Sequence, residues 1–297
     1  MLATSEAAVL GRGAVMVGVA PNGARKGKSD HPALPILPAE LADCAAACLA
    51  EGATWLHLHV RDASGQHSLD AGHYREAIAA VRERVGTAMV LQITTESAGR
   101  FGPPVQMAVV DAVAPEAASV AVRELFGADM DPATISTFLE GAARQRCALQ
   151  YIVYDAGDVA RLVALAAAGH LRDAAPNVLF VLGNYVQRRP GHPRELAPLL
   201  TALPADWPWT VCAFGPAEAA CATAAALAGG HVRVGFENNL HEPDGRVAPD
   251  NAALVRQAVT RVRNCGLAIA DIHETRRLLG MPPVATPIIP VVGTLAS

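Results

Sequence analysis

Two histidines separated by one residue are the strongest sign of chemistry in this sequence. His57 and His59 lie within Thr54 to Val60, a run whose apolar residues predict a β-strand. Side chains two residues apart on a strand point to the same face, so both imidazoles can approach one metal ion. Imidazole is the commonest protein ligand for zinc. Because paired strand histidines are also found hydrogen-bonded only to backbone, the pair alone leaves a metal site and a structural pair open.

The elements that must position these histidines alternate along the chain. Eight short β-rich runs each precede an Ala-rich amphipathic run, and several of the amphipathic runs begin with proline, which suits a first helical turn. The predicted strands span 14–20, 54–60, 89–95, 117–122, 148–154, 178–183, 209–214 and 232–237. The predicted helices span 39–50, 72–85, 104–113, 132–146, 156–168, 193–202, 216–228 and 249–264, with an extra one at 271–281.

This repeat predicts an α/β protein whose residues 1–297 form a single domain, a (β/α)8 TIM barrel with an extra C-terminal helix. Eight strand-then-helix units close a parallel barrel and leave no strand over. The run 178–182 is apolar throughout, as expected of a strand covered on both faces. The sequence has no linker, no G-x-G-x-x-G after a strand and no G-x-x-x-x-G-K-[ST], which argues against Rossmann and P-loop domains.

The composition excludes several classes of function. With 297 residues and 52% hydrophobic positions the chain can bury a large core, so disorder is excluded. The net charge of -4 argues against a nucleic-acid-binding surface. The six cysteines lack C-x-x-C spacing and are interpreted as reduced core residues, and the absence of a signal-like or membrane-spanning segment predicts a soluble, cytoplasmic protein. Low charge with high apolar content also predicts a homo-oligomer.

A third metal ligand is expected from another even-numbered strand, because alternate strands of a barrel supply the same interior layer and active sites lie at the strands' carboxyl ends. The eighth predicted strand carries Arg233 and Glu237 on one face, with Glu237 at its end. Together with His57 and His59, this carboxylate would leave an open coordination position, as catalytic zinc sites do. The alternative is a buried ion pair between Glu237 and Arg233 or Arg61.

Further polar residues fall at the same ends of predicted strands. Thr94 shares a face with Gln92, and if that face is inward, Thr94 is placed to donate a hydrogen bond to a bound carbonyl or carboxylate. Each such residue taken alone is equally consistent with a cap or a satisfied structural group. The other polar residues at this rim are Asn22, Arg25, Glu96, Ser119, Arg123, Glu124 and Gln150.

Four motifs together resemble the beta-keto acid cleavage enzymes, a family that includes the 3-keto-5-aminohexanoate cleavage enzymes. They are PNGA from Pro21, DHPALP from Asp30, HLHVRD from His57 and VRVGFENN from Val232, and the resemblance spans most of the chain. It implies a zinc-dependent barrel, usually tetrameric. It also implies the reaction, in which acetyl-CoA condenses with a β-keto acid to release acetoacetate and a new acyl-CoA.

The resemblance also implies roles for individual residues. The two histidines and Glu237 would hold Zn²⁺, and Arg233 falls where the family has a catalytic arginine. Thr94 falls where the family has a hydroxyl that hydrogen-bonds the substrate carboxylate, and Ser119 falls where it has a similar hydroxyl. Asn22 belongs to the first of the four motifs, and we assign it to substrate binding.

Two departures from the family pattern bear on mechanism and substrate. Asn238 stands where the best-known member has an aspartate base, and a neutral amide cannot accept the proton. Another base is therefore needed, such as Glu96 or a zinc-linked water. Arg25 stands where that member has a glutamate for the substrate ammonium, which favours an anionic tail such as a second carboxylate. Gln150 is a second candidate replacement for a carboxylate of that pocket.

The phosphates of CoA need a cationic edge, and Arg188 and Arg189 in the loop after the sixth predicted strand are the candidates. Two other classes of function remain open. One is a metal-dependent lyase or aldolase that acts on an oxo acid without CoA, for which the same three ligands would serve. The other is a binding protein that has lost catalysis, and Asn238 is its main support.

Overall fold

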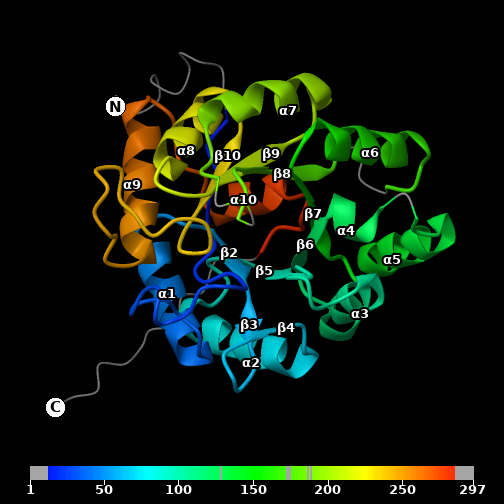
Figure 1. Ribbon diagram of the computed structural model, residues 1–297, viewed down its shortest axis with the longest axis horizontal. Helices are drawn as coiled ribbons and strands as arrows, with labels where there is room; N and C mark the ends of the chain where they lie inside the picture. The colour runs from blue at the N-terminus through cyan, green and yellow to red at the C-terminus, as the bar shows by residue number, and fades with distance from the viewer. Residues whose placement is uncertain (1–12, 128, 172–174, 186, 188, 285–297) are drawn as a thin grey trace.

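The structure, a computed structural model, describes residues 13–127, 129–171, 175–185, 187 and 189–284. Eight parallel strands form a closed barrel with the neighbour order β1-β10-β9-β8-β7-β6-β5-β2, and helices surround it (Figure 1). The predicted α/β barrel is confirmed. Its strands are β1 Val17–Val19, β2 Trp55–Leu58, β5 Val90–Thr94, β6 Ala117–Ala121, β7 Ala148–Val153, β8 Asn177–Leu182, β9 Trp209–Ala213 and β10 His231–Val234.

Proline and aspartate residues mark the N-termini of most of the helices. Proline occupies the first turn of three helices, and at one of these three and at four other helices an aspartate carboxylate accepts a hydrogen bond from a first-turn backbone N–H. The helices are α1 Pro38–Ala50, α2 Ala71–Val85, α3 Pro103–Val113, α4 Val122–Leu125, α5 Pro132–Arg144, α6 Ala156–Ala167, α7 Leu196–Ala202, α8 Glu218–Leu227, α9 Asn251–Asn264 and α10 Ile272–Leu278.

The extra C-terminal helix α10 closes one end of the barrel. Ile272 and Leu279 pack in one buried cluster with Met16 and Trp55, which lie at the start of β1 and β2. In Figure 1 the helix is seen behind the strands, in the middle of the barrel. Since α10 covers the amino ends of the strands, the carboxyl ends form the open face on which the candidate residues lie.

All eight barrel strands end earlier than the sequence pattern indicated, six of them by one residue and two by more. β2 stops at Leu58, and the chain continues into a two-stranded sheet of β3 Val60–Arg61 and β4 His67–Ser68 that was not predicted. β10 stops at Val234 because Gly235 adopts a φ of 132°, a conformation open to glycine, and turns the chain. Glu237 therefore lies on a turn beyond the strand. The short helix α4 was also not predicted.

The helix predicted at 193–202 is divided into a 3₁₀ turn, Pro193–Glu195, and α7. The helices predicted from 216 and 249 begin at Glu218 and Asn251 instead. Within the described part of the chain, no helix has the length and apolarity needed to cross a bilayer.

Candidate active site

The two histidines and Glu237 converge at the open face with the spacing of metal ligands. His57 Nε2 lies 3.1 Å from His59 Nε2, and Glu237 Oε2 lies 3.5 Å from the first nitrogen and 3.3 Å from the second. Ligand atoms held tetrahedrally by zinc at about 2.0 to 2.1 Å are about 3.3 Å apart. The three atoms therefore have the mutual distances of three zinc ligands, and both histidines are buried.

Their hydrogen bonding supports this interpretation. Glu237 Oε2 is buried and accepts no well-aligned hydrogen bond from the described residues. His57 Nδ1 lies 2.7 Å from the amide oxygen of Gln92. Because that oxygen can only accept, Nδ1 carries the proton and Nε2 presents its lone pair. Burial lowers the pKa of His57 to about 3, with the Arg233 charge acting in the same direction, so the imidazole is neutral, as a ligand must be.

Arg233 crosses the barrel interior beside this cluster. Its Nη2 donates to Glu237 Oε1 at 3.0 Å and to Asn238 Oδ1 at 3.2 Å. Burial alone would raise the pKa of Glu237, but the guanidinium holds it well below its usual range. Arg233 Nε and Nη1 are buried and have no acceptor among the described residues. The ion pair considered as the alternative to a metal is thus present with Arg233, yet it uses only one oxygen of Glu237.

The turn that carries Glu237 is fixed by buried side chains from two helices. The carboxylate of Glu218, at the start of α8, accepts hydrogen bonds from Gly235 N at 3.1 Å and from Asn239 Nδ2 at 3.2 Å. Asn251, at the start of α9, accepts from Phe236 N at 2.8 Å. These contacts join residues 15 to 21 positions apart in the sequence and hold the carboxylate ligand in place, and neither helix residue was recognised from the sequence.

The buried carboxyl of Glu218 makes a pH-dependent contribution to stability. Burial raises its pKa from 4.5 to about 8. An acid whose pKa is raised on folding stabilises the fold most below its unfolded pKa, so the contribution is lost as pH rises from about 4.5 towards about 8. Across this window the free energy of unfolding of the wild-type protein in urea, measured relative to that of Glu218→Gln, should therefore fall, because the two proteins share every other titrating group. An equal slope in both proteins would contradict the assignment.

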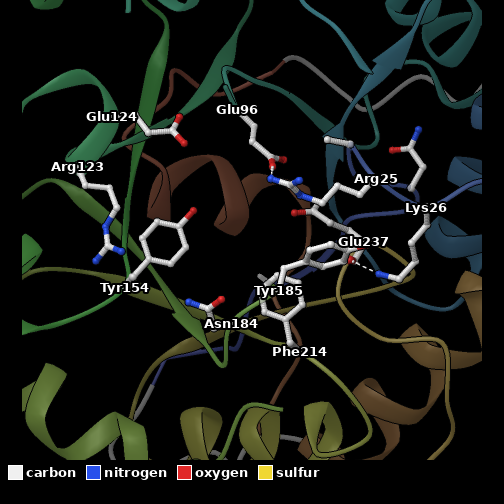
Figure 2. Close-up of a pocket in the computed structure, with 13 residues that line it drawn as sticks. Arg25, Lys26, Glu96, Arg123, Glu124, Tyr154, Asn184, Tyr185, Phe214 and Glu237 are labelled. Atoms are coloured by element: carbon white, nitrogen blue, oxygen red, sulfur yellow. Dashed lines mark hydrogen bonds and ion pairs between the residues drawn. The ribbon is translucent and has the colours of Figure 1, made fainter. Parts of the chain in front are cut away.

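A cavity lies directly above the cluster. Its outer chamber of about 230 Å³ shares five lining residues with an inner chamber of about 60 Å³ beside the ligands. Figure 2 shows Arg123 and Tyr154 on one side of the outer chamber and Arg25, Lys26 and Tyr185 on the other. The residues common to both chambers are Glu96, Glu124, Tyr154, Phe214 and Glu237.

Most of the predicted catalytic residues face the inner chamber. Thr94 and Asn238 line it, and the hydroxyl oxygen of Thr94 accepts a hydrogen bond from Glu96 N at 3.0 Å. Ser119 is buried next to this region with a hydroxyl that has no partner among the described residues, but it lines neither chamber. Gln150 lies deeper, where Gln92 Nε2 donates to it at 3.3 Å, and it faces neither chamber.

The predicted substrate-binding residues at the outer chamber are placed by the loop after β1. Asn22 lines the chamber and donates through Nδ2 to the main-chain oxygen of His59 at 3.1 Å. Arg25 Nη2 lies 3.7 Å from Glu96 Oε1. Arg61 donates to the main-chain oxygens of Gly23 and Lys26 rather than to Glu237, so the ion pair considered for it is not formed.

The structure describes one of the two residues predicted for CoA binding. Arg188 lies outside the described residues. Arg189 is paired with Glu195 at 2.8 Å and lines a neighbouring groove of about 510 Å³ that also includes Lys26 and Asn184.

Several cavity residues were not identified as site residues from the sequence. They come from loops, where no periodic pattern indicates which way a side chain points. They are Lys26, Tyr154, Asn184, Tyr185 and Phe214, whereas Arg123 and Glu124 on α4 were expected at this rim from the sequence.

The family of the chain follows from its sequence as a whole. Residues 14–281 match the family described as beta-keto acid cleavage enzyme. The chain belongs to this family. The resemblance carried by the four motifs is confirmed, and the protein is an acyl-transferring enzyme that cleaves a carbon–carbon bond.

Characterised relatives cover nearly the whole chain. The 3-oxoadipate:acetyl-CoA acetyltransferase of Cupriavidus necator is 27% identical over 90% of this chain and 95% of its own length. The 3-keto-5-aminohexanoate cleavage enzyme of Fusobacterium nucleatum is 28% identical over 87% of this chain and 95% of its own. The structure of ObcA with a C4-CoA adduct and oxalate superposes with a TM-score of 0.68 at 20% identity, covering 84% of this chain and 68% of ObcA, which supports the fold.

Proposed function

We propose that this enzyme is zinc-dependent and condenses a β-keto acid with acetyl-CoA to give acetoacetate and a new acyl-CoA. The observation that carries the proposal is the set of three ligand atoms at zinc-like distances beside a cavity, in a chain of this family. The similar Cupriavidus necator protein is named as an acetyltransferase that uses acetyl-CoA, which supports the same class of reaction. We further propose a cytoplasmic homotetramer.

The donor set suits zinc because it combines two neutral imidazoles with one carboxylate, as catalytic zinc sites do. When bound, zinc would polarise the ketone and stabilise negative charge as it develops on oxygen. Arg233 supplies the complementary protein charge. Its buried Nε and Nη1, which have no acceptor among the described residues, would donate to anionic substrate oxygens in the inner chamber.

Glu96 is the best-placed base for acetyl-CoA. Asn238 cannot take a proton and already accepts a hydrogen bond from Arg233, whereas Glu96 presents a carboxylate to both chambers. Burial raises the pKa of Glu96, and a raised pKa makes a carboxylate a stronger base. Its main chain is held by Thr94 and by His67, whose Nε2 lies 2.8 Å from Glu96 O.

The remaining candidates have supporting roles in this proposal. The Thr94 hydroxyl uses its oxygen to accept from the backbone, which leaves its proton to donate to a substrate carboxylate. Ser119 would supply a second hydroxyl near the substrate, and Gln150 would orient Gln92 by accepting its hydrogen bond. Arg189 and the groove beside it would receive the distal part of CoA.

The test is a mass-spectrometric assay of the zinc-loaded protein with acetyl-CoA and a panel of acidic, neutral and amino-bearing β-keto acids. Acetoacetate and a new acyl-CoA should form together, and only when acetyl-CoA is present. Cleavage that proceeds equally without CoA would instead establish a lyase. Ligand-induced thermal stabilisation without any turnover would establish a binding protein.

A further inference from the structure

Lys26 is a half-buried cation in the wall of the outer chamber. Its ammonium donates to the main-chain oxygen of Glu237 at 2.6 Å, as the dashed line in Figure 2 shows, and lies 5.6 Å from the centre of the Tyr185 ring. It forms no ion pair with any described residue. Two of its three protons therefore remain for a partner in the cavity, and burial lowers its pKa.

The other cations of the chamber are already neutralised. Arg25 lies 3.7 Å from Glu96, and Arg123 forms ion pairs of 2.6 Å with both Asp155 and Asp158. Lys26 also feels the charges of Glu237, Asp30 and Glu218, but it forms a direct ion pair with none of them. Lys26 is thus the lining cation that has no direct ion-pair partner and can take one from a ligand, within the part of the chain that the structure describes.

The loop that carries Lys26 is held before any ligand arrives. Arg61 donates through Nη2 to the main-chain oxygen of Lys26 at 2.8 Å and also to that of Gly23. Gly27 N donates to the Asp30 carboxylate at 2.8 Å. A cation fixed in this way loses little conformational freedom on binding, which favours affinity.

The position of Lys26 suits the carboxylate of a short substrate better than the diphosphate of CoA. Its ammonium donates a hydrogen bond to the main-chain oxygen of Glu237, and the carboxylate of the same Glu237 belongs to the ligand cluster. The ammonium therefore lies within the length of one residue from the cluster. The diphosphate of CoA is separated from the thioester by the whole pantetheine arm. An acetyl group at the inner chamber would place the diphosphate well beyond Lys26, whereas the second carboxylate of a short dicarboxylic acid would reach it.

We propose that Lys26 binds the distal carboxylate of a dicarboxylic β-keto acid and sets the preference of the enzyme for that class of substrate. This inference rests on the proposed function and shifts the role expected for Arg25 to its neighbour. Arg25 then holds Glu96, and Tyr185 packs beside both cations, with Arg25 5.1 Å from the ring centre.

The experiment compares two substrates that differ by one charge, 3-oxoadipate and its distal monomethyl ester, in the zinc-loaded enzyme. Lys26→Met should lower kcat/KM for the diacid by about 10- to 100-fold, the worth of a charge-assisted hydrogen bond, and by less than about 3-fold for the ester. Lys26→Arg should retain most of the preference. Lys28→Met is the matched control, since Lys28 is exposed and pairs with Glu40 at 2.7 Å.

An equal loss for both substrates, accompanied by weaker zinc binding, would mean that Lys26 acts only through Glu237 and would overturn the proposal. A second measurement separates its failure from that of the proposed reaction. Adipate should raise the thermal midpoint of the wild-type protein more than its monomethyl ester does, and Lys26→Met should abolish that difference. If no β-keto acid is turned over but this difference remains, the reaction is wrong and the anion site stands; if the difference is absent, the anion site is wrong.

Discussion

Replacing His57 by alanine is expected to remove bound zinc and to lower acyl exchange by about three orders of magnitude. Two ligand atoms would remain, His59 Nε2 and Glu237 Oε2, at 3.3 Å from one another. Charge developing on the substrate oxygen would then be stabilised mainly by Arg233. Metal analysis of the purified protein together with the mass-spectrometric assay measures both effects, and removal of metal from the wild-type protein by a chelator should reproduce them.

A graded variant makes this test sharper. Gln92→Leu leaves all three ligands but removes the acceptor that fixes His57 Nδ1, so zinc affinity should fall by about 10- to 100-fold without being lost. His273→Ala changes an exposed histidine on α10, at the opposite end of the barrel, and should retain zinc and activity. Full activity of His57→Ala with zinc still bound would show that the metal site lies elsewhere.

The barrel could be predicted because its strands are buried on both faces. The run Val178 to Leu182 is apolar at every position, and all of it is buried in β8. The His57 and His59 pair was equally visible, since His57 lies in β2 and His59 directly follows its last residue, so their proximity needs no long-range contact.

Glu237 was identified from the sequence by assuming that strand alternation continues to this residue, and the strand ends before it. Strand alternation placed it beside Arg233, but β10 ends at Val234 and the turn at Gly235 brings Glu237 to the cluster instead. The residues that hold this turn, Glu218 and Asn251, come from helices, and their contact with it depends on tertiary packing. No local pattern in the sequence predicts such a contact.

The sequence also cannot distinguish two neighbouring cations. Arg25 and Lys26 lie side by side in the same loop, and the motif comparison drew attention only to Arg25. Their difference lies in their partners, because Arg25 pairs with the Glu96 carboxylate whereas Lys26 donates a hydrogen bond to a main-chain oxygen and forms no ion pair with a described residue. This distinction requires coordinates, since Glu96 follows β5 and is 71 positions away from Arg25 in the chain (96 minus 25).

Glu96→Gln should lower kcat by about 10² to 10⁴ and change KM little, because general-base catalysis contributes this much and acts on a proton rather than on binding. The glutamine keeps the shape of the side chain and loses its ability to accept the proton. Exchange of the acetyl-CoA methyl protons with deuterated solvent isolates this step, and the variant should lose it.

The zinc content of the variant shows whether Glu96 acts as a base or only orients a zinc ligand, since Glu96 Oε2 also lies 3.9 Å from His59 Nδ1. Glu96→Gln should keep its zinc; if it loses zinc, Glu96 orients the ligand and is not shown to be the base.

A second variant tests whether a carboxylate at a neighbouring position can replace Glu96. Asn238 lines the inner chamber, so adding Asn238→Asp to Glu96→Gln should restore part of the deuterium exchange from the neighbouring position. Unchanged exchange in Glu96→Gln alone would assign proton removal to a zinc-linked water.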